Sequence, residues 1–155
     1  MKLYLVQHGE AVTKEIDPDR PLSEQGRQDV ERTAGFLKKT NVRVKQVFHS
    51  GKSRALQTAE ILVAALYSAG SVEVLDNIKP KDEVMPFANL VSSWQQDSLM
   101  VGHLPFMAKA VCMLLTGNEE QAAIDFKPGS LVCLERKENG AWGLAWMIRP
   151  ELFRE

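Results

Sequence analysis

Three short apolar segments of this sequence each end at a histidine with a glycine close by. These ends read His8-Gly9, His49-Ser50-Gly51 and Gly102-His103, and Arg20 and Arg54 stand in the loops that follow the first two. Arginine binds phosphate through two parallel N–H bonds, and a neutral histidine nitrogen can attack phosphorus. If these residues meet in the folded chain, they predict a site for a dianionic phosphate with a histidine nucleophile.

The elements around these residues predict that they do meet. Apolar residues at 3–6, 42–48 and 99–101 are typical of strands, and helical spacing follows the first two, at 23–39 and 55–66. Successive strand–loop–helix units predict an α/β fold with a parallel sheet. The carboxyl ends of parallel strands lie on one edge of the sheet, where open α/β sheets place their ligands.

After residue 70 the sequence predicts a strand, two helices and a terminal hairpin, at residues 72–75, 87–94, 105–117, and 130–135 with 141–148. Residues 77–86 are expected to form a loop, and Asn139-Gly140 between apolar runs is a strong hairpin signal. The polar tail from Arg149 is expected to fray. Ser23 is expected to cap the helix that follows it, although Gly26 stands where the glutamate of a capping box would be.

Length and composition predict a single domain over residues 1–155. Of these 155 residues 45% are hydrophobic and 25% charged, as in ordinary soluble globular proteins. The net charge of −1 creates no broad field for nucleic acid or membrane, so neither is expected as a partner. Cys112 and Cys133 stand among apolar residues and are expected to be buried thiols. No segment suits a signal peptide or a membrane span, so the expected compartment is the cytoplasm.

Other phosphate and metal chemistries have less support. The sequence contains no GxxxxGK[ST] loop and no GxGxxG after a strand, which disfavours nucleotide-binding folds of those types. A zinc site formed by His8, His49 and His103 is disfavoured because neither paired cysteines nor an HExxH spacing accompanies them. No metal or other cofactor is therefore expected. His49 is expected to be a hydrogen-bonded structural residue.

Four segments carry a more specific signal when they are taken together. They are LVQHGEA, DPDRPLSEQG, VFHSGKSRALQTAEIL and LMVGHLPFM, in that order within residues 3–107. This combination resembles the histidine phosphatase superfamily, and more closely its small SixA-type phosphohistidine phosphatase branch. The resemblance implies a phosphoglycerate mutase-like fold: three α/β/α layers, a mostly parallel central sheet with helices on both faces, and a C-terminal β-hairpin.

The resemblance also implies a role for each matching residue. His8 matches the histidine that becomes transiently phosphorylated, and Arg54 matches the arginine that clamps the phosphoryl oxygens. His103 matches the second histidine, which hydrogen-bonds the transferring group and stabilises its developing charge. Arg20 matches a further arginine of the SixA-type branch near the same pocket. Gly9 is expected to keep the backbone close to the phosphate.

Two further positions border this set. Ser50 is expected either to contribute its hydroxyl or to cap the following helix, and the cap is favoured. Gln7 stands where the superfamily has arginine, and its amide offers two neutral N–H donors against an arginine's five. Losing one preorganised donor can cost ~10²–10³ in rate. Arg20, Lys52 or Lys14 would then supply the missing positive charge.

These observations predict a phosphohistidine phosphatase. It would act through a covalent intermediate on His8, with a phosphohistidine-bearing protein as partner and inorganic phosphate as product. Glu10, Asp82 and Glu83 are candidates for a general acid, but none stands out, which favours phosphohistidine because a protonated imidazole leaves readily. Two alternatives stay open: a phosphomonoesterase or mutase of the same fold acting on a small phosphorylated molecule, and a non-catalytic phosphate- or phosphoprotein-binding module, motivated by Gln7.

Overall fold

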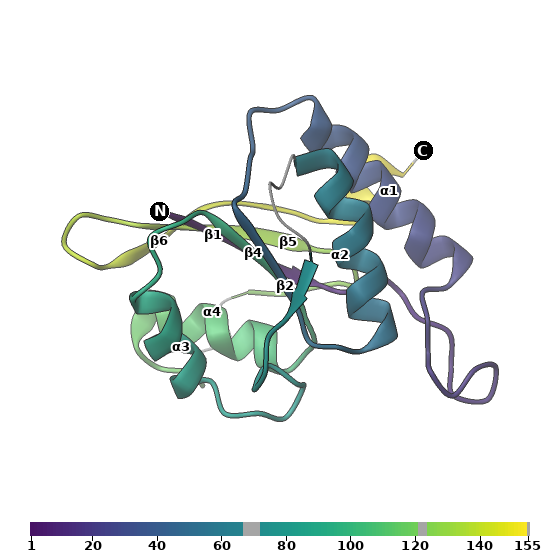
Figure 1. The fold of residues 1–155 in the computed structure, drawn as a ribbon, viewed down its shortest axis with the longest axis horizontal. Helices are drawn as coiled ribbons and strands as arrows, with labels where there is room; N and C mark the ends of the chain where they lie inside the picture. The colour runs from purple at the N-terminus through teal and green to yellow at the C-terminus, as the bar shows by residue number, and fades with distance from the viewer. Residues whose placement is uncertain (67–71, 121–123, 155) are drawn as a thin grey trace.

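The computed structural model describes residues 1–66, 72–120 and 124–154. Its strands are β1 Lys2–Gln7, β2 Gln46–His49, β3 Val72–Val74, β4 Ser98–Gly102, β5 Leu131–Arg136 and β6 Trp142–Ile148. Its helices are α1 Glu24–Lys38, α2 Ser53–Leu66, α3 Met85–Ser92 and α4 Phe106–Thr116, followed by a short 3-10 helix, η1 Pro150–Phe153. The six strands form one sheet in the order β3-β2-β4-β1-β5-β6 (Figure 1).

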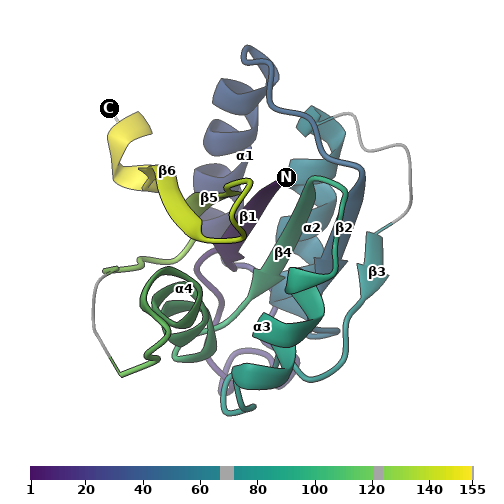
Figure 2. The same cartoon turned by 90° about the vertical axis from the view of Figure 1, so that its left-hand side faces the viewer.

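In this order the strands β3, β2, β4 and β1 are parallel to one another, whereas β5 and β6 are added in antiparallel pairing. β1 lies between β4, with which it is parallel, and β5, with which it is antiparallel. α1 and α2 cover one face of the sheet, and α3 and α4 cover the other (Figure 2). The predicted three-layer α/β fold with a C-terminal hairpin is therefore confirmed.

The central strand β1 is buried on both faces. Tyr4 and Val6 belong to the core under α1 and α2, whereas Leu3 and Leu5 belong to the core under α3 and α4. Each such fully buried leucine stabilises the fold by roughly 1.5–3 kcal/mol. The residues that leave β1 at its carboxyl end are thus carried on a rigid support.

Two other expectations from composition are tested by the structure. Cys112 and Cys133 are buried and free, as predicted. Within the described residues, no helix combines the length and the apolar character needed to cross a membrane.

The second strand is shorter than predicted. The sequence predicts a strand over residues 42–48, whereas β2 begins at Gln46. The N–H of Val42 binds the hydroxyl of Thr40 at 3.2 Å instead of a neighbouring strand. Val44 is buried in the core without lying in a strand. The alternation of apolar and polar residues that includes Val44 therefore results from burial of its side chain and not from pairing in a strand.

The helix α3 also begins earlier than predicted. It starts at Met85, inside the segment 77–86 that the sequence assigns to a loop. Pro86 stands in its first turn, where a missing backbone N–H costs no hydrogen bond. The proline that suggests a loop is thus compatible with a helix start.

The C-terminal tail is docked, which corrects the expectation that it frays from Arg149. The rings of Phe153 and Phe36 lie 5.0 Å apart, so η1 packs against α1. Arg154 donates two hydrogen bonds to the carboxylate of Asp29, at 2.6 and 3.1 Å. Burial alone would raise the pKa of Asp29, but the hydrogen bonds it accepts hold that pKa below its usual value. The last residue of the chain lies outside the described part.

The first turn of α1 is fitted closely to the loop that follows β1. The Ser23 hydroxyl accepts the N–H of Gly26 at 3.0 Å, which confirms the predicted cap. A Cβ atom on Gly26 would lie 2.0 Å from the carbonyl oxygen of Glu10. A capping-box glutamate therefore has no space at this position. The missing box residue marks the place where the loop carrying His8 rests on the helix.

Replacing Gly26 with alanine is expected to destabilise the protein by about 1–3 kcal/mol, because the added methyl group would overlap the Glu10 backbone. Gly35→Ala is the matched control, since Gly35 is exposed in the same helix and its Cβ would meet nothing within 4 Å. The control is expected to stabilise the protein by roughly 0.5–1 kcal/mol. Thermal or denaturant unfolding measures both effects, and shifts of the same sign would contradict the prediction.

Candidate active site

Strand register brings two of the predicted histidines together. β1 and β4 are paired so that Gln7 lies opposite Gly102, and the next residues along the two strands are His8 and His103. The backbone N–H of His8 also donates to the carbonyl of Gly102 at 3.0 Å. As a result, the two imidazole rings lie side by side, with centroids 4.9 Å apart.

The third histidine, His49, has a different environment at the end of β2. It is buried, and its Nδ1 accepts the N–H of Gly51 at 3.0 Å, which fits the structural role expected for it. Among the described residues, no three His, Cys, Asp or Glu side chains are grouped so as to hold a metal ion.

The ring of His8 is held in one tautomer by its own loop. Nδ1 lies 2.6 Å from the carbonyl oxygen of Gly9, and a carbonyl only accepts, so Nδ1 carries the proton and Nε2 keeps its lone pair. Burial lowers the pKa of His8 to about 4 against the opposing effect of the Gly9 carbonyl, and the charges of Arg54 and Arg20 lower it further. At neutral pH the ring is uncharged, which is the form that a nucleophile requires.

His103 is more deeply buried and is oriented by Ser50. Its Nε2 lies 2.5 Å from the Ser50 hydroxyl, whereas its buried Nδ1 has no hydrogen-bond partner among the described residues. Burial is the main cause that lowers its pKa to about 3, followed by the electrostatic interaction with His8 and then by the charges of Arg54 and Lys52. The Ser50 oxygen also receives the N–H of Lys52, but at 3.4 Å. The short contact of Ser50 is therefore with the histidine and not with the start of α2.

Two arginines approach this pair of rings. Arg54 stands in the first turn of α2, and its buried Nε has no hydrogen-bond partner among the described residues. Burial and the nearby charge of Arg20 lower the pKa of Arg54. Arg20 adopts a left-handed backbone conformation, with φ of 47°, and its Nε donates to the carbonyl of Val12 at 3.0 Å. Two like charges held near each other favour an anion bound between them.

Buried polar atoms without partners are concentrated here. The buried side chain of Gln7 leaves its Oε1 unpaired, as do Nε of Arg54 and Nδ1 of His103 among the described residues. Such atoms are nearly always hydrogen-bonded in folded proteins. The backbone of Gln7, in contrast, is fully engaged, since its N–H donates to Ser130 and its carbonyl accepts from Gly129. Nε of Arg54 and Nδ1 of His103 are therefore available to hydrogen-bond a bound anion.

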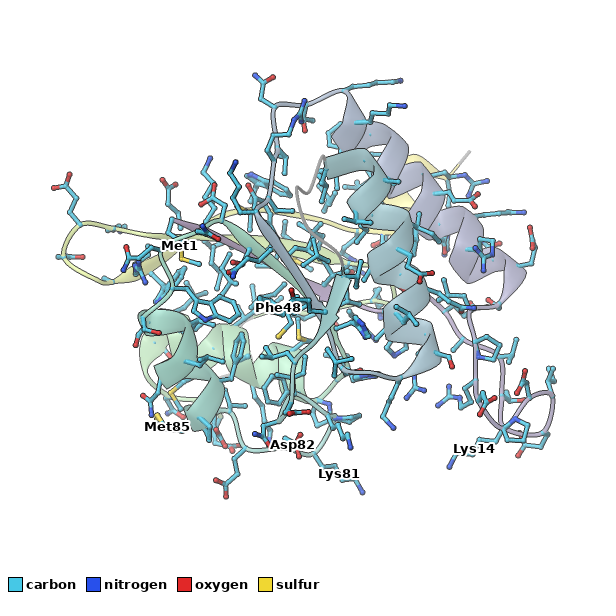
Figure 3. The ribbon with its side chains drawn as sticks, viewed as in Figure 1. Met1, Lys14, Phe48, Lys81, Asp82 and Met85 are labelled. Atoms are coloured by element: carbon cyan, nitrogen blue, oxygen red, sulfur yellow. The ribbon has the colours of Figure 1, made fainter. Side chains whose placement is uncertain are left out.

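The lysines proposed to replace the missing arginine lie at different distances from the rings. Lys52 is close enough for its charge to lower the pKa of His103. Lys14 is exposed on the loop between β1 and α1, where this loop projects away from the sheet (Figure 3). The structure therefore brings Arg20 and Lys52 to the site and leaves Lys14 outside it.

The carboxylates considered as general acids are engaged elsewhere. Glu10 is exposed and accepts the Ser23 hydroxyl at 2.8 Å, beside the start of α1. Asp82 accepts the backbone N–H of Lys79 at 2.8 Å, in the loop before α3 (Figure 3). Glu83 is exposed in the same loop. None of the three makes a described contact with His8 or with the other residues of the predicted site.

Two residues of α2 that hold the site together were not identified from the sequence. The hydroxyl of Thr58 accepts the N–H of Gly9 at 3.0 Å, and the side chain of Gln57 accepts the N–H of Leu22 at 2.7 Å. Both follow Arg54 by about one helical turn. That spacing is the one available signal, because a residue four positions after a ligand-binding residue shares its helix face.

A search of protein families finds the model of the histidine phosphatase superfamily (branch 1) over residues 3–79. This match runs from β1 to β3 and includes His8 and Arg20, in the loop between β1 and α1, and Arg54 in α2. The resemblance to the histidine phosphatase superfamily is confirmed. An uncharacterised protein of Picosynechococcus sp. (strain ATCC 27264 / PCC 7002 / PR-6) is 29% identical over 128 residues, which cover 76% of this chain and 77% of that protein.

Solved structures show the same fold over nearly the whole chain. A SixA protein histidine phosphatase in complex with tungstate superposes with a TM-score of 0.88 at 24% identity, over 99% of this chain and 100% of that one. A mutant phosphoserine phosphatase from Entamoeba histolytica in complex with phosphoserine gives a TM-score of 0.72 at 15% identity, over 97% and 98% of the two chains. At these identities the structural similarity establishes the shared phosphoglycerate mutase-like fold.

The different places of the two lysines lead to a prediction about anion binding. Lys52→Ala is expected to weaken binding of tungstate or inorganic phosphate by roughly two- to fivefold, as expected for a partly exposed charge. Lys14→Ala is the control and is expected to leave the affinity unchanged, because Lys14 lies outside the site. Calorimetric titration at low ionic strength measures both. An equal loss of affinity in the two variants would point to a diffuse surface field instead.

Proposed function

We propose that this protein is a phosphohistidine phosphatase, which removes a phosphoryl group from a histidine of another protein. The observation that carries the proposal is the neutral ring of His8, whose Nε2 is left free by the hydrogen bond of Nδ1 to Gly9. The ring of His103 lies next to it, and the nearby Arg54 has an Nε without a partner among the described residues. A nucleophile, a cation for phosphoryl oxygens and a further hydrogen-bonding group are what histidine-mediated phosphoryl transfer requires.

The proposed reaction has two displacements at phosphorus. In the first, Nε2 of His8 attacks and the bond between phosphorus and the substrate imidazole breaks; that imidazole, already protonated on its other ring nitrogen, leaves as a neutral ring. In the second, water attacks the phosphorus, the bond to Nε2 breaks, and inorganic phosphate leaves. The hydrogen bond from Nδ1 to the Gly9 carbonyl supports both steps, because it stabilises the positive charge that the ring carries while it is phosphorylated.

The other site residues are proposed to hold the phosphoryl oxygens. Arg54 and Arg20 would bind them through charge-assisted hydrogen bonds, and His103, oriented by Ser50, would donate to the transferring group. The amide of Gln7 would supply neutral donors. These groups neutralise the charge that a metal ion covers in other phosphoryl-transfer enzymes, so the proposal includes no cofactor.

The environment of the carboxylates favours a phosphohistidine over a phosphate ester. An alkoxide leaving group needs a general acid, whereas Glu10 and Asp82 are bound to Ser23 and to the Lys79 backbone. An imidazole that is already protonated leaves without such help. A protein-borne phosphohistidine is therefore the substrate class that fits the described residues best.

The proposal predicts a covalent intermediate. Incubation with a protein carrying radiolabelled phosphohistidine is expected to transfer an acid-labile, alkali-stable label to this chain, and His8→Ala is expected to abolish the label. His49→Gln is the control, since His49 is engaged with Gly51 and is expected to leave labelling intact. A label that persists in His8→Ala would place the nucleophile elsewhere.

A phosphatase for small metabolites is the second candidate, because the same fold occurs in a phosphoserine phosphatase crystallised with phosphoserine. The two candidates differ in substrate size and in the leaving group. Comparing kcat/KM for a phosphohistidine protein with kcat/KM for phosphoserine and sugar phosphates separates them. Faster turnover of the small esters would favour a small-metabolite phosphatase over a phosphohistidine phosphatase.

Substitutions of Gln7 test whether the protein catalyses phosphoryl transfer or only binds phosphate. Gln7→Arg restores a charged donor and is expected to raise kcat by about tenfold or more, whereas Gln7→Ala removes the amide donors and is expected to lower it. Single-turnover release of phosphate measures both variants against the wild-type protein. If the wild-type protein binds tungstate but forms no label and releases no phosphate, while Gln7→Arg does, the natural chain is a phosphate-binding module.

A further inference from the structure

Three consecutive hydrogen bonds join the ring of His8 to the backbone of Arg54, and Thr58 is the middle link. Nδ1 of His8 donates to the Gly9 carbonyl at 2.6 Å, and the N–H of Gly9 donates to Thr58 Oγ1 at 3.0 Å. The Thr58 hydroxyl then donates to the carbonyl of Arg54 at 2.8 Å. The proposed nucleophile and the proposed oxyanion clamp stand on different elements, so this connection fixes one relative to the other.

Thr58 is well placed to act as a fixed point. Its side chain is fully buried in α2, one turn after Arg54. Branching at Cβ restricts its χ1 angle, and the carbonyl four residues earlier takes up its hydrogen. Because that hydrogen is directed at Arg54, the lone pairs of the oxygen are left for the N–H of Gly9. Both functions of the hydroxyl are therefore used within the site.

Gly9 has little freedom to move away from this contact. A Cβ atom on Gly9 would lie 2.9 Å from the side chain of Val30 and 3.1 Å from the carbonyl oxygen of Gly26, so α1 limits it on one side. Thr58 holds its N–H on the α2 side. Since the carbonyl of Gly9 also fixes the tautomer of His8, any shift of Gly9 reaches the nucleophilic Nε2 directly.

We propose that Thr58 is a positioning residue for phosphoryl transfer, which sets the distance and orientation of His8 relative to Arg54. This inference rests on the proposed function. Thr58 itself touches neither the phosphoryl group nor the reacting atoms and acts through Gly9 and through the helix. Its loss is therefore expected to reduce kcat more than the affinity for the phosphoryl group, because misplacement of a nucleophile by about 1 Å can cost 10²-fold in rate.

A second buried threonine provides a matched control. Thr33 is also buried in a helix, α1, but its hydroxyl has no hydrogen-bond partner among the described residues. Valine replaces the hydroxyl by a methyl group of similar size at either position, and only Thr58→Val leaves the buried N–H of Gly9 unpaired. Thr58→Ser keeps the hydroxyl and removes the methyl group, so it separates hydrogen bonding from packing.

The test is steady-state turnover of a phosphohistidine-bearing protein, at a temperature where all variants are folded. Thr58→Val is expected to lower kcat by about 10- to 100-fold while KM stays within about threefold of the wild-type value. Thr58→Ser is expected to retain kcat within about threefold, and Thr33→Val to match the wild-type protein. Amide hydrogen exchange at Gly9, measured by NMR, is expected to be faster in Thr58→Val and close to wild-type in Thr58→Ser.

Two results would overturn the inference while leaving the proposed function intact. One is a wild-type kcat in Thr58→Val, and the other is an equal loss in Thr58→Ser, which would assign the effect to packing. Failure of the proposed function has a different signature: the wild-type protein itself releases no phosphate from the phosphohistidine protein. In that case the amide hydrogen exchange at Gly9 tests the role of Thr58. Equal protection of the Gly9 amide in Thr58→Val and in the wild-type protein would contradict the hydrogen bond that joins Thr58 to the loop.

Discussion

The charge of Arg54 is the constraint to which the rest of the site conforms. Its guanidinium is partly buried, its Nε is unpaired among the described residues, and Arg20 adds a second positive charge nearby. A partly buried cation with an unpaired N–H disfavours further positive charge around it. Burial is the main cause that lowers the pKa values of His8 and His103 to about 4 and about 3, and the charge of Arg54 lowers both further, so both rings are neutral. A bound dianion would reverse this balance, and it would favour the protonated, donating form of His103 as the substrate enters.

The geometry of the site depends on contacts between elements that are distant in the sequence. The register of β1 against β4 sets the distance between the two rings, because a slip by one residue would turn each side chain to the opposite face. The loop after β1 is then confined by Gly26 of α1 and by Thr58 of α2. The long loop between β1 and α1 is thus held in place next to His8, the residue that carries the proposed chemistry.

The sequence predicts the layers of the fold and the places of His8, Arg54 and His103, because parallel topology sends every strand end to the same edge. It does not predict the role of Thr58, since a threonine on the buried face of a helix resembles any core residue and its partner, Gly9, is 49 positions away. The docked tail is missed for a similar reason. Arg154 and Asp29 are 125 positions apart, and polar composition alone does not reveal a partner. Patterns within one element are readable from sequence, whereas pairs between elements require the fold.

Glutamine at position 7 is consistent with the positive charge already present at the site. An arginine at this position would add another cation beside Arg54, Arg20 and Lys52, and it would increase their mutual repulsion whenever the site is empty. Glutamine avoids that cost, but it gives up a charged donor to the phosphoryl oxygens. It also places a buried carbonyl oxygen, Oε1, where arginine has only N–H groups. Glutamine at this position therefore lowers the repulsion in the empty site, and in the proposed phosphoryl transfer it gives up stabilisation of the transition state in return.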